Sequence, residues 1–156
     1  ELPHFGSFDL VWALDDAINY LLSEEELKSA LIGMRANLAP GGLVMFDLNT
    51  LRTYRTFFTE RQVVEHEGSR LTWSGNANPD VAAGSICEAR FEIEGGDPAT
   101  AGQHRQRHFP EADVISALAS AGLECLEVLG HGLDGVPRQP LDEAQHTKAI
   151  YIARAA

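Results

Sequence analysis

The most constraining feature of this sequence is an apolar run that ends abruptly in two carboxylates. The run is Phe8–Leu14, and Asp15 and Asp16 follow it directly in the segment FDLVWALDDAINYL. It lacks the apolar–polar alternation of a half-exposed strand, and such runs are typical of parallel strands that helices cover on both faces. Ligands of open α/β sheets bind beyond the carboxyl ends of the strands, so the polar residues here are the first candidates for a functional site.

A helix and a second buried strand are predicted next. Ser23 and Glu26 have the spacing of a capping box, which predicts a helix start. The apolar residues that follow at helical spacing are Leu27, Ala30, Leu31, Met34 and Leu38. Pro40-Gly41-Gly42 is expected to end this helix, and Leu43–Leu48 is predicted to be a strand that closes on Asn49. A strand, a helix and a strand in this order predict parallel pairing.

Alternation appears only in the middle of the chain. Apolar and polar residues alternate around residues 87–93, which is typical of an antiparallel sheet with one solvated face. The strands predicted for this sheet are Gln62–Glu65, Leu71–Asn76, Cys87–Ile93 and Gln103–Phe109, with a turn at residues 94–98. Such an insertion in an α/β chain is often a cover over the site.

The last part of the chain again has the pattern of an α/β fold. Pro110 and Gly122 suit the two ends of a helix, and Leu123–Leu129 is predicted to be a third strand of the main sheet. Residues 131–145 are predicted to be a loop. The final strand, Ala149–Ala153, is expected to run antiparallel at the edge of the sheet.

Composition excludes several classes of function. The formal net charge of -11 argues against binding to nucleic acid, which depends on Lys and Arg. No apolar run is long enough to span a bilayer and no signal peptide is evident, which predicts a cytoplasmic protein without a membrane partner. The chain begins with Glu1 rather than Met, so it is expected to start inside a longer protein.

Three segments in this order resemble the class I S-adenosylmethionine-dependent methyltransferases. They are FDLVWALDDAINYL, LAPGGLVMFDLNT and HRQRHFPEADVISALASAGLECLEV. The strongest motif is L-x-P-G-G-x-x-x-F-D-x-N at Leu38–Asn49. The resemblance extends from Phe8 to Arg154 and is closest to small bacterial members with an antiparallel insertion before the last helix.

The resemblance implies a Rossmann-like α/β fold that is incomplete. It divides the chain into a first part of the core (1–59), an antiparallel β insertion that covers the substrate (60–109) and the last part of the core (110–156). Family members bind S-adenosyl-L-methionine mostly through an earlier half of the sheet, with a glycine-rich turn and an acidic strand end. Gly41-Gly42 follows a helix and precedes a strand, which is the wrong context for that turn. The chain is therefore expected to lack the cofactor-binding half and to be inactive alone.

The resemblance also implies which residues form the site. Leu14 and Asp15 are expected to contact the cofactor, and Asp15 is the first catalytic candidate, as a group that orients the acceptor or stabilises developing positive charge. Its competing role is to cap the next helical turn. The residues expected to contact the substrate are Asp16, Asn19, Tyr20, Asn49, Tyr54, Trp73 and Arg107. Their alternatives are capping, turn formation, core or lid packing and, for Arg107, a structural salt bridge.

Two histidines on one predicted strand need separate treatment. His104 and His108 share a face of that strand, but they lie too far apart along it to bind one ion easily and have no third ligand nearby. No metal site is predicted. His108 is instead a second catalytic candidate, as the base that removes a proton from the acceptor.

Three functions remain open at this stage. The first is a methyltransferase acting on a nitrogen or oxygen of a small molecule. The second is a non-catalytic half-domain, or a subunit completed by another chain. The third is the later half of another Rossmann-like enzyme such as a dehydrogenase, which the LAPGGLVMFDLN segment disfavours. Without the neighbouring strand of the family's sheet, Phe8–Leu14 would form an open apolar edge, which predicts a homodimer or another association there.

Overall fold

The computed structural model describes residues 2–95 and 100–155, so most of the turn predicted at 94–98 lies outside it. Five strands form the main sheet in the order β1-β2-β9-β7-β8. Their bounds are β1 Phe8–Ala13, β2 Leu38–Asn49, β7 Leu123–His131, β8 Pro137–Arg138 and β9 Lys148–Ala155. β1 and β2 pair in parallel, as predicted, whereas β9 runs antiparallel to both β2 and β7.

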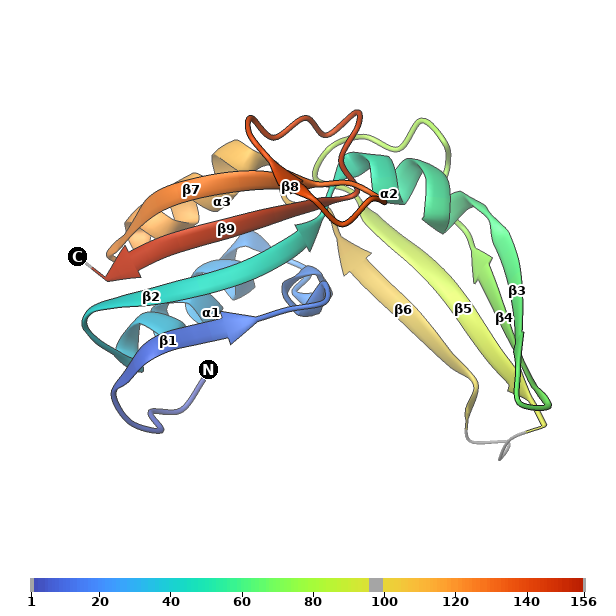
Figure 1. Cartoon of the computed structure of the whole chain (residues 1–156), viewed down its shortest axis with the longest axis horizontal. Helices are drawn as coiled ribbons and strands as arrows, with labels where there is room; N and C mark the ends of the chain where they lie inside the picture. Colours follow the sequence, from blue (N-terminus) through green and yellow to red (C-terminus); the bar gives the residue numbers. More distant parts are fainter. Residues whose placement is uncertain (1, 96–99, 156) are drawn as a thin grey trace.

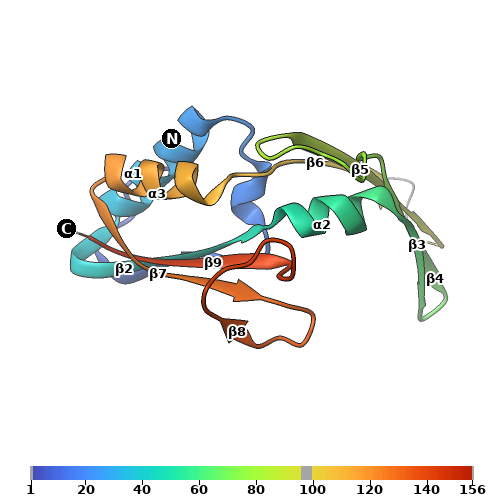
Figure 2. The ribbon, with the colours of Figure 1, turned by 90° about the horizontal axis from the view of Figure 1, so that it is seen from above.

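One face of this sheet carries the two long helices, α1 (Glu24–Ala36) and α3 (Glu111–Ser120), as Figure 1 and Figure 2 show. The predicted capping box is confirmed, because the Ser23 side chain accepts from the Glu26 N–H while the Glu26 carboxylate accepts from the Ser23 N–H. The main core lies between these helices and the sheet, where Phe46 of β2 stacks on Tyr151 of β9 at a centroid distance of 5.2 Å.

The prediction that helices cover both faces of the first strand was wrong. Val11 and Ala13 pack against the core, but Leu10 and Trp12 on the opposite face are 47% and 62% exposed. Both long helices lie on the face that carries Val11 and Ala13. β1 is an edge strand of the described sheet. The apolar run therefore forms the open edge that the sequence indicated.

Two further expectations need correction. The final strand β9 is antiparallel, as predicted, but it lies in the middle of the sheet, because it fills the space between β2 and β7. The first helix ends at Ala36, before the Pro40-Gly41-Gly42 segment, which instead belongs to β2. The Asn37 side chain amide donates to the Gly33 carbonyl (2.9 Å) and the Pro3 carbonyl (3.0 Å), so Asn37 is the residue that ends the helix.

A second sheet lies beyond the carboxyl ends of β1 and β2 (Figure 1). It is fully antiparallel in the order β3-β4-β5-β6, as predicted. The strands are β3 Arg61–His66, β4 Ser69–Gly75, β5 Ile86–Glu94 and β6 Gly102–Arg107.

Three short helical segments lie where the two sheets meet: the first follows β1 and contacts β6, and the other two connect β2 to β3. They are η1 (Ala17–Tyr20), α2 (Leu51–Thr56) and η2 (Phe57–Thr59), of which only the first was predicted. Tyr54 of α2 and Phe58 of η2 form a second small core with Cys87 and Ala89 of β5. Among the described residues, no helix is long and apolar enough to cross a membrane.

Candidate active site

A cavity of about 630 Å³ lies where the carboxyl ends of β1 and β2 meet the second sheet. Its charged lining consists of Asp15, Asp16, Glu60, Arg52 and Lys148, and its aromatic lining of Tyr20, Phe57, Phe58 and Trp73. The uncharged polar lining includes Asn49 and Gln106, and His104 also lines the cavity. This is the position at which open α/β sheets bind their ligands.

Asp15 and Asp16 occupy the turn after β1 in an uncommon backbone conformation. Both have positive φ (60° and 53°), which costs a non-glycine residue roughly 1 kcal/mol or more. The turn is held by the Asp16 N–H, which donates to Asp47 Oδ2 at 3.1 Å. The Asp15 side chain lies at the rim of the cavity and is 99% exposed. The Asp16 side chain makes no hydrogen bond that caps η1. The two carboxylates therefore face the cavity rather than cap a helix.

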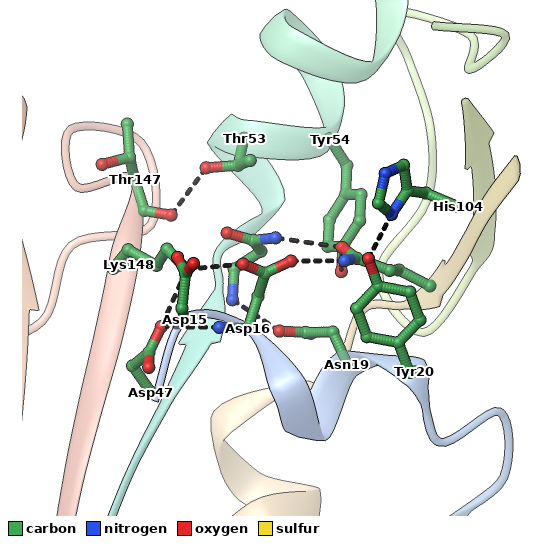
Figure 3. Close-up of polar contacts among 12 residues, drawn as sticks. Asp15, Asp16, Asn19, Tyr20, Asp47, Thr53, Tyr54, His104, Thr147 and Lys148 are labelled. Atoms are coloured by element: carbon green, nitrogen blue, oxygen red, sulfur yellow. Dashed lines mark hydrogen bonds and ion pairs between the residues drawn. The ribbon is translucent and has the colours of Figure 1, made fainter. Parts of the chain in front are cut away.

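Lys148, at the start of β9, joins the three strand ends. Its Nζ lies 2.8 Å from Asp47, 3.1 Å from Asp16 and 3.8 Å from Asp15 (Figure 3). Burial acts to lower the pKa of the Lys148 ammonium, but the hydrogen bond to Asp47 and the charges of Asp16 and Asp47 outweigh it, so the pKa is raised. One cation thus balances part of three negative charges.

Side-chain amides fasten the second sheet to the first. Gln106 of β6 donates to Asp16 and accepts from Asn49 Nδ2 at 3.0 Å. Asn19 of η1 donates to the Arg107 carbonyl at 2.8 Å and accepts from the Asn49 N–H at 2.9 Å. The side of the cavity formed by β6 is therefore fixed to β1 and β2 by buried hydrogen bonds.

The structure brings together about half of the residues predicted for the site. Asp15, Asp16, Tyr20, Asn49 and Trp73 line the cavity. Leu14, Asn19, Tyr54, Arg107 and His108 do not. Asn19 is fully buried with its amide engaged by backbone groups, and Tyr54 lies in the second core. Both side chains therefore make contacts within the fold.

Arg107 and His108 turn away from the cavity. The Arg107 guanidinium donates to the Leu22 carbonyl and to Glu24, both at 3.1 Å, which is the structural salt bridge weighed from the sequence. His108 Nδ1 accepts from the Gly84 N–H, so the neutral ring carries its proton on Nε2, which donates to Glu143 at 2.8 Å. Both ring nitrogens are engaged and only 2% of the residue is exposed, so His108 lies in a buried hydrogen-bond network outside the cavity lining, and its role as a base stays a prediction.

Glu143 has a depressed pKa that reflects this contact. Burial alone would raise the pKa of Glu143, but the hydrogen bonds from His108 and from the Leu51 N–H outweigh it and lower the pKa. Glu143 thus ties the loop before β9 both to the start of α2 and to the segment after β6.

Several cavity residues were not proposed from the sequence. No functional role was predicted for Lys148, Gln106 or Arg52, and His104 was considered only as a metal ligand. In residues 2–95 and 100–155 there is no group of three or more His, Cys, Asp or Glu side chains that could hold a metal ion. Strand alternation places Gln106 and His104 on one face of their strand, because residues two apart share a face, but it assigned no role to Gln106.

Comparison with known proteins agrees with the resemblance. No family model matches the chain. A protein of Geobacillus sp. (strain WCH70), named only provisionally as a methyltransferase, is 25% identical over 143 residues, which are 89% of this chain and 58% of that protein. The chain thus spans less than two thirds of the curated relative that it matches.

Solved structures give the same fold. A S-adenosylmethionine-dependent methyltransferase from Clostridium acetobutylicum ATCC 824 matches with a TM-score of 0.79 and 16% identity, over 99% of this chain and 61% of that one. The CcbJ methyltransferase from Streptomyces caelestis matches with a TM-score of 0.67 and 21% identity, over 97% and 62%. The sugar N-methyltransferase KedS8 from Streptoalloteichus sp ATCC 53650 gives 0.61 and 24%, over 97% and 58%.

These matches define the class of protein first: an α/β fold of the Rossmann-like type with an antiparallel sheet beside the strand ends. More closely, the fold is that of the class I S-adenosylmethionine-dependent methyltransferases, and the chain corresponds to the C-terminal part of those proteins.

Proposed function

We propose that this chain forms the acceptor-facing part of a S-adenosylmethionine-dependent methyltransferase that acts on a nitrogen or oxygen of a small molecule. The observation that carries this proposal is the cavity at the carboxyl ends of β1 and β2, with the exposed Asp15 carboxylate at its rim and the second sheet beside it. The sugar and glycopeptide N-methyltransferases among the similar structures support a small-molecule acceptor.

The described residues fit the cofactor only in part. Leu14 and Asp15 stand at the end of β1, where they would contact it, and no glycine-rich turn between a strand and a helix occurs in residues 2–95 or 100–155. When bound, the cofactor supplies an electrophilic methyl group on a sulfonium. The chain's own contribution is to align the acceptor, which can account for most of the acceleration of such a displacement, and to shield it from water.

A second candidate is a non-catalytic half-domain, or a subunit completed by another chain. The absence of a glycine-rich turn between a strand and a helix in the described residues favours it.

One titration separates these two functions. We expect the full-length gene product to bind S-adenosylmethionine and S-adenosylhomocysteine in calorimetry, and the 156-residue chain alone to give no heat of binding. Transfer of a labelled methyl group to a panel of amino sugars would then identify an acceptor. A full-length product that binds neither compound would favour the non-catalytic function.

We also propose that the isolated 156-residue chain self-associates through the β1 edge. Leu10 and Trp12 present apolar surface next to unpaired backbone groups, which is a template for pairing with a second copy. Sedimentation at tens of micromolar should show dimers or larger species, and the double change Leu10→Lys with Trp12→Lys should shift the chain towards monomer.

The other exposed edge provides the control for this experiment. Val63→Lys with Val64→Lys alters β3, one of the two edge strands of the second sheet, and should leave the association unchanged. A well-folded monomeric wild-type chain would refute the proposal.

A further inference from the structure

Tyr20 and His104 meet in the cavity wall although one belongs to the short helix after β1 and the other to the second sheet. Tyr20 ends η1, after β1, and His104 lies on β6. The Tyr20 hydroxyl is hydrogen-bonded to His104 Nδ1, and both side chains line the cavity (Figure 3). The pair therefore forms only when the second sheet is fastened against the main sheet.

Aromatic rings hold the imidazole in place. Trp73 of β4 and Phe91 of β5 lie 5.1 Å and 5.2 Å from the His104 ring, measured between centroids. His104 Nε2 has no hydrogen-bond partner in the described part of the chain. The ring is thus fixed by packing and by a single polar contact, the one with Tyr20.

The protonation state of this pair follows from its surroundings. Burial raises the pKa of the Tyr20 hydroxyl, although the neighbouring Gln106 amide opposes this, so Tyr20 keeps its proton and is the donor. His104 Nδ1 is then the acceptor, and the neutral ring carries its proton on Nε2. Asp16, another carboxylate of the cavity lining, is already engaged by Gln106 and Lys148.

We propose that Tyr20 takes the proton from the methyl acceptor and passes its own proton to His104 Nδ1. The inference rests on the proposed function. The lone pair of the acceptor nitrogen or oxygen forms the bond to the methyl carbon, and the electron pair of the breaking carbon–sulfur bond stays on sulfur. The acceptor's proton moves to Tyr20 Oη and the tyrosine proton to Nδ1, which leaves an imidazolium that returns a proton to water. Tyr20 is the catalytic residue, and His104 is the proton acceptor behind it.

The cavity's other ionisable groups define the electrostatic setting of this transfer. They are Asp15 and Asp16 from the end of β1, Glu60 before β3, Arg52 on α2 and Lys148 on β9. Trp73 and Phe91, which pack on the imidazole, are uncharged. The imidazolium formed in the transfer therefore shares the cavity with three carboxylates.

Nitrogen-15 NMR of the histidine rings in the full-length gene product tests the hydrogen bond without any acceptor. We expect Nδ1 of neutral His104 to be unprotonated in the wild type and its shift to change in Tyr20→Phe. His66→Gln, at an exposed histidine of β3, is the control and should leave the His104 signals unchanged. A protonated Nδ1, or a His104 signal that Tyr20→Phe does not move, would overturn the proposal.

Kinetics with the amino sugar that the full-length product methylates tests the proton transfer itself. Tyr20→Phe and His104→Ala should each lower kcat by about 100-fold, the usual contribution of such a base, while the Kd for S-adenosylhomocysteine stays within about twofold. Added imidazole should restore part of the rate of His104→Ala but not of Tyr20→Phe. A His104→Ala variant with wild-type kcat overturns the relay alone, whereas a wild type that fails to bind S-adenosylhomocysteine contradicts the proposed function.

Discussion

Replacing Lys148 by methionine is expected to lower the free energy of unfolding by about 3 kcal/mol at neutral pH. The ammonium faces Asp15, Asp16 and Asp47, and its side chain is only 23% exposed. Removing one partner of a buried ion pair leaves the other charge uncompensated and costs about 3–5 kcal/mol, and the partial exposure places this case at the low end. Urea unfolding monitored by circular dichroism measures the difference.

The pH dependence has a defined direction. The pKa of Lys148 is raised in the folded state, so its contribution to stability is complete at neutral pH and is lost only as the pH rises through that value in alkali. Adding Asp47→Asn to Lys148→Met should recover part of the loss, because it removes one of the unpaired charges. Lys28→Met, at an exposed position of α1, is the control and should change stability by less than about 0.5 kcal/mol. Equal losses in the two lysine variants would contradict the central position of Lys148.

The substitution Asn19→Leu is expected to destabilise the protein by about 2–4 kcal/mol. Leucine has a similar size, but it leaves the buried Asn49 N–H without a partner and the Arg107 carbonyl with only the longer hydrogen bond from the Tyr54 hydroxyl, at 3.3 Å. Each unsatisfied buried group costs about 1–3 kcal/mol. Urea unfolding measures the loss. Relative to wild type, hydrogen exchange should become faster in β6 than it does in β2.

The exposed Asn76 provides the comparison for this variant. Asn76→Leu lies at the end of β4, away from the contact between the sheets, and should leave both stability and β6 exchange near wild type. An Asn19→Leu protein with unchanged exchange in β6 would mean that other contacts hold the second sheet.

Local patterns were sufficient to predict most elements. The capping box at Ser23 and Glu26 defined the start of α1, and period-two alternation identified the second sheet. The order of strand, helix and strand predicted the parallel pairing of β1 and β2. Because the carboxyl ends of parallel strands share one edge, Asp15 and Asn49 were expected to lie close together, and they line the same cavity.

Contacts between residues far apart in the chain could not be predicted from local patterns. Lys148 lies 132 positions after Asp16, and nothing in its neighbourhood marks it as a partner of that carboxylate. The central place of β9 depends on how β2 and β7 are spaced, which is a property of the assembled sheet. His108 was a catalytic candidate, but it follows the last residue of β6, and its ring is bonded to Glu143 of the loop before β9, a contact between distant segments that no local pattern indicates.

The division of the cavity between two sheets has a practical consequence for redesign. The carboxylates and the lysine belong to the strand ends of the main sheet, whereas Trp73 and His104 project from β4 and β6. Under the proposed function, grafting residues 61–107 from another protein of this fold is expected to change the selectivity for the acceptor, provided that the anchoring amide at position 106 is kept. The residues of the main sheet would stay unchanged, and the grafted second sheet would determine which acceptor fits.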